Sequence, residues 1–169
     1  LDANYFFTKG KTRSLGDIVS IKVEDSFVKH IAEEIKKTLS PAEQEVEMAI
    51  YRASAGAKGD KDIESFRSIA SDDLRGDASD VREKMQKAAR WAQVDLSTAI
   101  GLTPNEEIRA EIIEKYPNGN FKVRAVKRVN YRGSSRMMSV VGIAPVADFD
   151  EKDAVASGKL YEYKVKVAR

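Results

Sequence analysis

The stretch of sequence that decides the fold covers residues 112–157 and reads IIEKYPNGNFKVRAVKRVNYRGSSRMMSVVGIAPVADFDEKDAVAS. Near its start stands a turn signal of four residues, Pro117, Asn118, Gly119 and Asn120. Asn-Gly is the strongest short-range hairpin signal, because both residues tolerate a positive φ angle. We therefore predict that Asn118 and Gly119 form a two-residue turn, or its close bulged variant, between strands near residues 106–116 and 120–131.

Alternation of apolar and polar residues around this turn gives each strand a buried face and a wet face. After the turn, one parity is apolar and holds Phe121, Val123, Ala125, Val129 and Tyr131. The other parity is polar and mostly basic, with Lys122, Arg124, Arg128, Asn130 and Arg132. Residues 133–135 (Gly-Ser-Ser) then turn the chain again, and residues 137–143 read as a third strand, so we predict a β-meander.

Further strands are predicted near both ends of the chain. Val19, Ile21 and Val23 alternate with polar residues, and so does the final run of Tyr161, Tyr163, Val165 and Val167. Between these strands the apolar residues follow the 3.6-residue period of helices. The predicted fold class is α+β, with an antiparallel sheet built from the N-terminal strand and the C-terminal half. We expect residues 1–24 and 102–169 to form this β-rich core and residues 25–101 to form a helical insertion.

The insertion reads as four helices. The first covers residues 25–39, where Asp25 or Ser26 can act as the N-cap. The second begins at Ser40, followed by proline at the first helical position and by Glu43, which completes a capping box. A short third helix is marked by Ile63, Phe66 and Ile69, and a fourth is capped near residues 77–79 and ends near 99–101. The residues expected to face inward are Val46, Ala49, Ile50 and Ala53 in the second helix, and Val81, Met85, Ala88, Trp91 and Ala92 in the fourth.

The composition narrows the possible functions. The chain has 169 residues, of which 42% are hydrophobic and 33% charged, which suits one globular domain or one domain with a substantial insertion. The net charge of +2 gives no strong global field for nucleic acid. There is no cysteine, which excludes disulfides, thiol catalysis and cysteine metal sites. No apolar run approaches the roughly 18 residues that a membrane helix requires.

No group of residues has the spacing of a catalytic or cofactor site. His30 is the only histidine, whereas catalytic and metal-binding histidines act with partners. A calcium loop of the EF-hand type needs a central glycine, which is missing among the acidic residues Asp148, Asp150, Glu151 and Asp153. We therefore expect no enzymatic activity, no cofactor and no required metal.

Basic residues gather on and near strand 121–132. They are Lys122, Arg124, Lys127, Arg128, Arg132 and Arg136. An alternative function is therefore a polyanion or nucleic-acid binding module that uses this basic face. Proteins that bind single strands expose aromatic side chains for stacking, but Phe121 and Tyr131 share the apolar parity here. An acidic neighbouring subunit or lipid head groups fit the same basic face equally well.

Three blocks of the chain resemble the flagellar L-ring protein family of the bacterial basal body. The first is residues 7–24, FTKGKTRSLGDIVSIKVE, which contains Gly16 and Asp17. The second is residues 113–128, where the Pro-Asn-Gly-Asn turn precedes an alternating strand. The third block holds Gly142, Pro145, Asp148, Phe149, Asp150, Val155 and Ser157.

The resemblance implies a structural, non-enzymatic ring that acts as an outer-membrane bushing around the flagellar rod. It implies many copies of the chain in one ring, contacts with the P-ring protein and the rod, and no nucleic acid. The final strand is then a candidate assembly edge, carried by Tyr161, Tyr163, Val165 and Val167. An edge strand has free backbone groups that a neighbouring subunit can pair with.

The chain also differs from this family in three respects. Family members usually carry an N-terminal lipidated cysteine, and this chain has no cysteine. The middle of the chain is charged and helical in pattern, where the family carries segments rich in serine, threonine and glycine. The chain ends in Val167, Ala168 and Arg169, whereas an apolar tail is common in the family.

Overall fold

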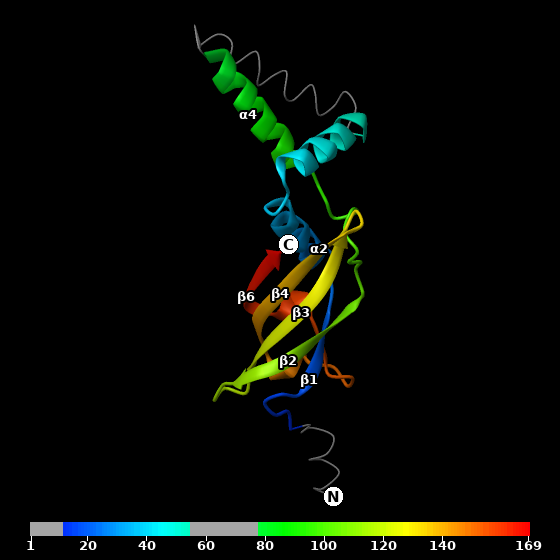
Figure 1. Ribbon diagram of the computed structural model, residues 1–169. Coiled ribbons are helices and arrows are strands. Elements are labelled where there is room, and N and C mark those ends of the chain that lie inside the picture. Colours follow the sequence, from blue (N-terminus) through cyan, green and yellow to red (C-terminus); the bar gives the residue numbers. More distant parts are fainter. Residues whose placement is uncertain (1–11, 55–77) are drawn as a thin grey trace, which may run out of the picture. The chain divides into compact units, whose positions relative to one another are not determined.

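The computed structural model describes residues 12–54 and 78–169 (Figure 1). The predicted helix around Ile63, Phe66 and Ile69 lies outside these residues, as does residue 77 of the predicted cap. The chain divides into two compact units. The sheet unit consists of Leu1–Thr38 and Ser97–Arg169, and the helical unit consists of Leu39–Leu96.

The sheet unit is built around a six-stranded sheet with the order β5-β1-β2-β3-β4-β6. Its strands are β1 (Ile18–Lys22), β2 (Glu107–Lys115), β3 (Phe121–Tyr131), β4 (Ser134–Ala144), β5 (Ala154–Ala156) and β6 (Tyr161–Ala168). All neighbours are antiparallel except β1 and β5, which run parallel. The predicted α+β class and the predicted sheet are confirmed, with the parallel β5 as an addition that the sequence pattern did not indicate.

The turn between β2 and β3 is the bulged variant of a hairpin turn. The Gly119 N–H donates to the Tyr116 carbonyl at 3.0 Å, and the Tyr116 N–H donates to the Asn120 carbonyl at 2.9 Å. Gly119 has a φ of 90°, a conformation that residues with a Cβ adopt at a cost. The Asn118 side chain accepts a hydrogen bond from the Asn120 N–H at 3.0 Å, which tightens the same loop.

The next hairpin turns one residue earlier than residues 133–135. Arg132 and Gly133 have φ angles of 43° and 80°, and Tyr131 pairs with Ser134. Positive φ at both central residues is the geometry of a two-residue type I′ loop, which matches the twist of the strands. The predicted turn signal at Gly133 was therefore correct, but Ser134 and Ser135 already belong to β4.

The core lies between the sheet and helix α2 (Asp25–Lys36). Phe27, Ile31 and Ile35 on α2 are at most 1% exposed. The five apolar residues predicted to face inward on β3 are buried, namely Phe121, Val123, Ala125, Val129 and Tyr131. Burying one large apolar side chain contributes about 1.5–3 kcal/mol, so this layer carries most of the stability of the unit.

The predicted N-cap of α2, Asp25 or Ser26, is wrong. Glu24 is the N-cap residue, and its side chain makes no capping hydrogen bond. The Glu24 N–H instead donates to the Ser157 hydroxyl at 3.1 Å, and its carboxylate accepts a hydrogen bond from the Gly158 N–H at 3.0 Å. The start of the helix is thus fixed by a contact across more than a hundred residues, which local spacing does not reveal.

The helical unit contains a helix over residues 41–54 and helix α4 (Ala78–Gln93). The predicted capping box is confirmed. The Ser40 N–H donates to Glu43 Oε1 at 3.0 Å, and the Glu43 N–H donates to Ser40 Oγ at 3.2 Å. The two helices are linked by Lys87, whose ammonium lies 2.8 Å from Glu45 Oε1. The hydrogen bond from Lys87 and its charge lower the pKa of the Glu45 carboxyl.

The inward faces predicted for these two helices are wrong. Val46, Ile50, Val81 and Met85 are between 40% and 52% exposed. The alanines predicted to share those faces, Ala49, Ala53, Ala88 and Ala92, are exposed as well, and Trp91 is half-buried. Helical spacing shows which residues share a face, but packing decides which face is covered. Helix α4 also ends at Gln93 instead of residues 99–101, and Val94 and Leu96 are buried in the segment that follows it.

Candidate functional site at the sheet edges

The first block of family-like residues shapes the entrance to β1. Gly16 has a φ of 87°, and its N–H donates to the Ile112 carbonyl of β2 at 2.8 Å. The Asp17 carboxylate accepts a hydrogen bond from the Ser14 N–H at 2.8 Å. Gly16 and Asp17 therefore close a turn that joins β1 to β2, which is a structural role.

Gly142 lets two strands approach closely. A Cβ atom at this position would lie 2.8 Å from the Cβ of Tyr163 on β6, so a larger residue would push β6 away from β4. Pro145 follows β4 and precedes the 3-10 helix η1 (Val146–Asp148), where the Asp148 N–H donates to the Pro145 carbonyl at 3.1 Å. These residues end β4 and turn the chain toward the opposite edge of the sheet.

Asp150 organises the loop before β5. Its Oδ1 accepts hydrogen bonds from the Lys152 N–H at 2.8 Å and from the Ala154 N–H at 3.0 Å. The hydrogen bond from Ala154 is the main cause of a lowered pKa of the Asp150 carboxyl, and the bond from Lys152 lowers this pKa further. The next residue of the motif, Val155, is fully buried in β5.

The same loop is held by Arg13 from the start of the described chain. Its guanidinium donates to Asp153 Oδ1 from Nε at 3.1 Å and from an Nη atom at 2.8 Å, and lies 4.5 Å from the centre of the Phe149 ring. The Asp153 backbone has a φ of 59°, and the Asp153 carbonyl accepts a hydrogen bond from the Ser20 N–H at 2.9 Å.

Ser157 lies just after β5, at the start of the 3-10 helix η2 (Ser157–Lys159). Its hydroxyl accepts a hydrogen bond from the Glu24 N–H, which joins this edge of the sheet to the start of α2. The side chains of Asp17, Asp150 and Ser157 bind backbone atoms of their own chain, while Gly16, Gly142 and Val155 serve turns, close approach and packing. The sequence singled out these residues by resemblance, and the structure brings most of them together at the edge formed by β1 and β5.

β6 lies at the opposite edge of the sheet, beside β4 alone among the described strands (Figure 1). The expectation that its four apolar residues share one face is wrong for Tyr161. The register slips between Val141 and Ile143, and Glu162 has a φ of 47°, which is the geometry of a β-bulge. Tyr161 consequently pairs with Ile143 on the solvent face, whereas Tyr163, Val165 and Val167 face α2.

The buried side of β6 is attached to α2 through Tyr163. Its ring lies 5.9 Å from that of Phe27, and its hydroxyl shares a hydrogen bond of 3.1 Å with His30 Nδ1. The other ring nitrogen of His30 lies 3.7 Å from Glu34 Oε1. Sequence reasoning placed His30 as a solvated or half-buried helix residue and missed this contact. The one available signal was the parity of Tyr163 on an apolar strand face.

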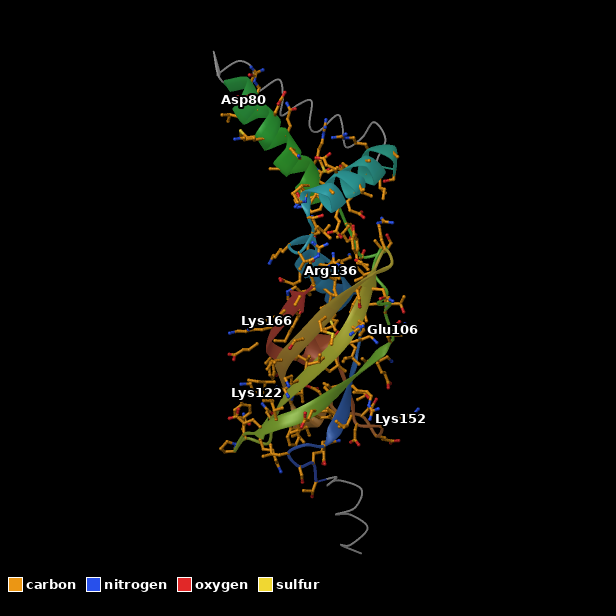
Figure 2. All side chains as sticks on the ribbon, in the orientation of Figure 1. Asp80, Glu106, Lys122, Arg136, Lys152 and Lys166 are labelled. Atoms are coloured by element: carbon orange, nitrogen blue, oxygen red, sulfur yellow. The ribbon has the colours of Figure 1, made fainter. Side chains whose placement is uncertain are left out.

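The predicted basic surface is only partly on the solvent side. Lys122, Arg124 and Arg128 are on the open face of β3, but Arg136 is 2% exposed and lies on the core side of β4. Its Nε donates to Thr38 Oγ1 at 3.1 Å, and an Nη atom donates to Ser134 Oγ at 2.7 Å. Arg136 (labelled in Figure 2) thus links the beginning of β4 to Thr38, which follows α2.

Across residues 12–54 and 78–169, no three acidic or histidine side chains come together as a metal-ion group. Over the same residues, each helix is too short or too polar to pass through a bilayer.

The motif residues described above serve turns, close strand approach and packing, which are structural roles, and β6 lies at an edge of the sheet. The comparison with known families makes this structural role specific, because the model of the flagellar L-ring protein, FlgH, matches residues 2–168. The chain belongs to the flagellar L-ring protein family. It is a structural, non-enzymatic component of the L ring of the basal body, located at the bacterial outer membrane. A search of curated proteins found no match.

Proposed function

We propose that copies of this chain join into the L ring through the open edge of β6, and that the finished ring contacts the P-ring protein and the rod. The observation that carries the proposal is the place of β6 at the end of the strand order. Its outer backbone groups can pair with a strand of a neighbouring subunit, while the charges of Lys164 and Lys166 discourage uncontrolled stacking.

Two contacts support β6 as a preformed edge. Tyr163 is packed against Phe27 and His30, so α2 holds the inner side of the strand. Gly142 allows β6 to lie close to β4. An edge that is already ordered loses less conformational entropy when a neighbour binds, which favours assembly.

The opposite edge is less suited to the same role. β5 has three residues, and its approach is held by the contacts of Arg13 with Asp153 and Phe149. A closed ring requires two different surfaces to meet at each contact, because a surface that pairs only with itself gives a dimer. The surface that receives β6 therefore differs from β6 in this proposal.

We further propose that the helical insertion is separable from the β-rich core. The expected insertion was 25–101, but α2 packs on β6, so we place the separable part at residues 39–96, as the division into units supports. Replacement of residues 39–96 by a short glycine-serine linker should leave a cooperatively unfolding sheet. A chain that loses its sheet signal in circular dichroism would contradict this placement.

The test of the assembly edge uses proline at two adjacent positions, Lys164→Pro and Val165→Pro. Neighbouring residues of a strand direct their N–H groups to opposite sides, so Lys164→Pro loses a bond to β4. Val165→Pro loses a donor at the open edge, together with a half-buried side chain that faces α2. Lys164→Pro should unfold at lower urea than Val165→Pro. Val165→Pro should remain folded, with a smaller loss of stability, but fail to build rings in cells. Complete outer rings and normal swimming with the folded variant would overturn the proposal.

A further inference from the structure

The solvent face of β3, β4 and β6 carries an ordered pattern of cations and apolar residues. The registers place four rows across the three strands. In order along the sheet, these rows are Lys122-Ile143-Tyr161, Arg124-Val141-Lys164, Val126-Ser139-Lys166 and Arg128-Met137-Ala168. Each row contains a cation, no row contains a carboxylate, and the central strand β4 contributes Met137, Val141 and Ile143. We call these twelve residues the basic face.

The basic face has a defined border and an open surface. On the β2 side the basic face borders two exposed carboxylates. Glu114 Oε2 lies 3.9 Å from Lys122 Nζ, and Glu111 Oε2 lies 3.9 Å from an Nη atom of Arg124. Exposed ion pairs at this distance contribute about 0–1 kcal/mol, so they leave these cations able to bind other anions. Val126 and Tyr161 are 55% and 57% exposed, although both are large apolar side chains. Lys122 on β3 and Lys166 on β6 are labelled in Figure 2.

The end of the face near the β2–β3 turn is hollowed. Tyr161 and Ile143 line an open groove of about 780 Å³ together with residues 116–118 and 120 of the turn and with Glu162, the one acidic residue of the groove. Tyrosine favours the boundary between apolar and polar surroundings, because its ring is apolar and its hydroxyl forms hydrogen bonds. Two tyrosines thus lie at the end of a surface that is both cationic and apolar.

We propose that the basic face docks on an anionic lipid surface. A second copy placed face to face is disfavoured, because it would bring the five cations of one face against the five of the other. Lysine is depleted at protein interfaces, yet three of these five cations are lysines. Lysines beside exposed aliphatic and tyrosine side chains are typical of surfaces that lie in the head-group region of a membrane. The outer-membrane location of the family supplies such a surface.

This inference uses the family's location and is independent of strand pairing at the β6 edge. The side chains of the basic face point out of the sheet, whereas the edge pairs through backbone groups in the plane of the sheet. Both surfaces can therefore be occupied in one subunit, and the failure of one proposal leaves the other standing.

The experiment measures sedimentation of the full chain with vesicles of phosphatidylcholine, with and without phosphatidylglycerol. Each lysine near an anionic surface contributes about 1 kcal/mol, which is about fivefold in the partition coefficient. The double variant Lys164→Gln/Lys166→Gln should therefore bind the anionic vesicles about 30-fold more weakly. Binding of the parent chain should weaken as salt is added, because salt screens exposed charges.

The matched control is Lys152→Gln/Lys159→Gln, which removes the same charge from exposed lysines outside the basic face. It should lose much less binding than the first double variant. A third variant, Val126→Ser/Met137→Ser, removes apolar contact and should weaken binding with the salt dependence unchanged. Retention of the parent's circular dichroism spectrum and unfolding midpoint shows that each variant is folded.

Three results would overturn the inference. The first is equal binding to vesicles with and without phosphatidylglycerol, and the second is equal loss in the two lysine variants. The third comes from cells in which a photo-crosslinking residue replaces Val126. Crosslinks to an acidic protein and none to lipid would show that the basic face is a protein interface.

Discussion

In the sheet unit the residues that alternate along the sequence are buried, whereas in the helical unit the residues at helical spacing are largely exposed. Phe121, Val123 and Val129 of β3 are at most 4% exposed. Val46 and Val81, the first residues of the inward faces predicted for their helices, are 52% and 51% exposed. Both units follow their local periodicity, so the difference lies in the partner that covers each apolar face.

The comparison teaches that helical spacing alone does not show whether an apolar helix face is covered, since that of α2 is buried and those of the helical unit are largely exposed. A strand in a sheet is held on both sides by backbone bonds, so its two faces are set once its register is set. A helix satisfies its backbone internally, and any side can turn toward a neighbour. In the sheet unit, long-range contacts such as those of Glu24 with Ser157 and Gly158 add to the order.

The largest expected effect comes from truncating the core of the sheet unit. Phe27→Ala removes a ring that is 1% exposed and packs on Tyr163, and should cost about 3–5 kcal/mol. Val46→Ser in the helical unit should stay within about 0.5 kcal/mol, because this side chain is half in water. Urea unfolding followed by circular dichroism measures both. The fluorescence of Trp91, the only tryptophan, follows the helical unit separately.

A result in which Val46→Ser costs as much as Phe27→Ala would break the comparison. It would mean that the exposed faces of the helical unit are covered in solution. A loss confined to the Trp91 signal in the Phe27→Ala variant would equally contradict the assignment of α2 to the sheet unit.

An intermediate effect is expected at the β2–β3 turn. Gly119→Val should destabilise the chain on the order of 1–2 kcal/mol or more, because a β-branched residue resists the φ of 90° found there. The control is Gly101→Ala, whose added Cβ would meet its nearest atom at 3.5 Å, an ordinary contact. An unchanged unfolding midpoint for Gly119→Val, measured by urea unfolding, would show that the sheet tolerates another turn.

The smallest effect is expected at Asp150, which is exposed. Hydrogen bonds from Ala154 and Lys152 lower its pKa in the folded state, so its contribution is present above the ordinary pKa of aspartate. The contribution is lost as the pH falls through the lowered, folded-state pKa. Asp150→Ala should therefore lower the thermal midpoint at neutral pH more than in strong acid. Asp150→Asn retains an oxygen acceptor and should lose less, and an equal loss at every pH would contradict the role of the charge.

The sequence was informative wherever structure depends on neighbours along the chain. It predicted the strands other than β5, the turn at Gly119 and the capping box of Ser40 and Glu43, because each needs only a few adjacent residues. It missed the bulge at Glu162, which moves Tyr161 to the other face, because a bulge arises from the register with a second strand. It also missed the burial of Arg136 and the contact of His30 with Tyr163, which depend on packing between distant segments.

The candidate site was predictable to the same extent. The family-like residues were found by resemblance, but the contacts that each of them makes could not be predicted from their spacing. Asp17 and Asp150 satisfy backbone N–H groups close to them in the chain, and such turns have recognisable sequence signals. The Ser157 hydroxyl accepts a hydrogen bond from the Glu24 N–H, although the whole insertion separates the two residues along the chain. No local sequence signal indicates such a contact.

The central claim is that β6 is the assembly edge, and backbone hydrogen exchange across residues 161–168 tests it most directly. The measurement compares the isolated chain with intact rings extracted from envelopes, using mass spectrometry of the same peptides. The account predicts that amides of β6 directed away from β4 exchange quickly in the isolated chain and become protected in the ring. Intact rings in which those amides exchange as fast as in the isolated chain would contradict it.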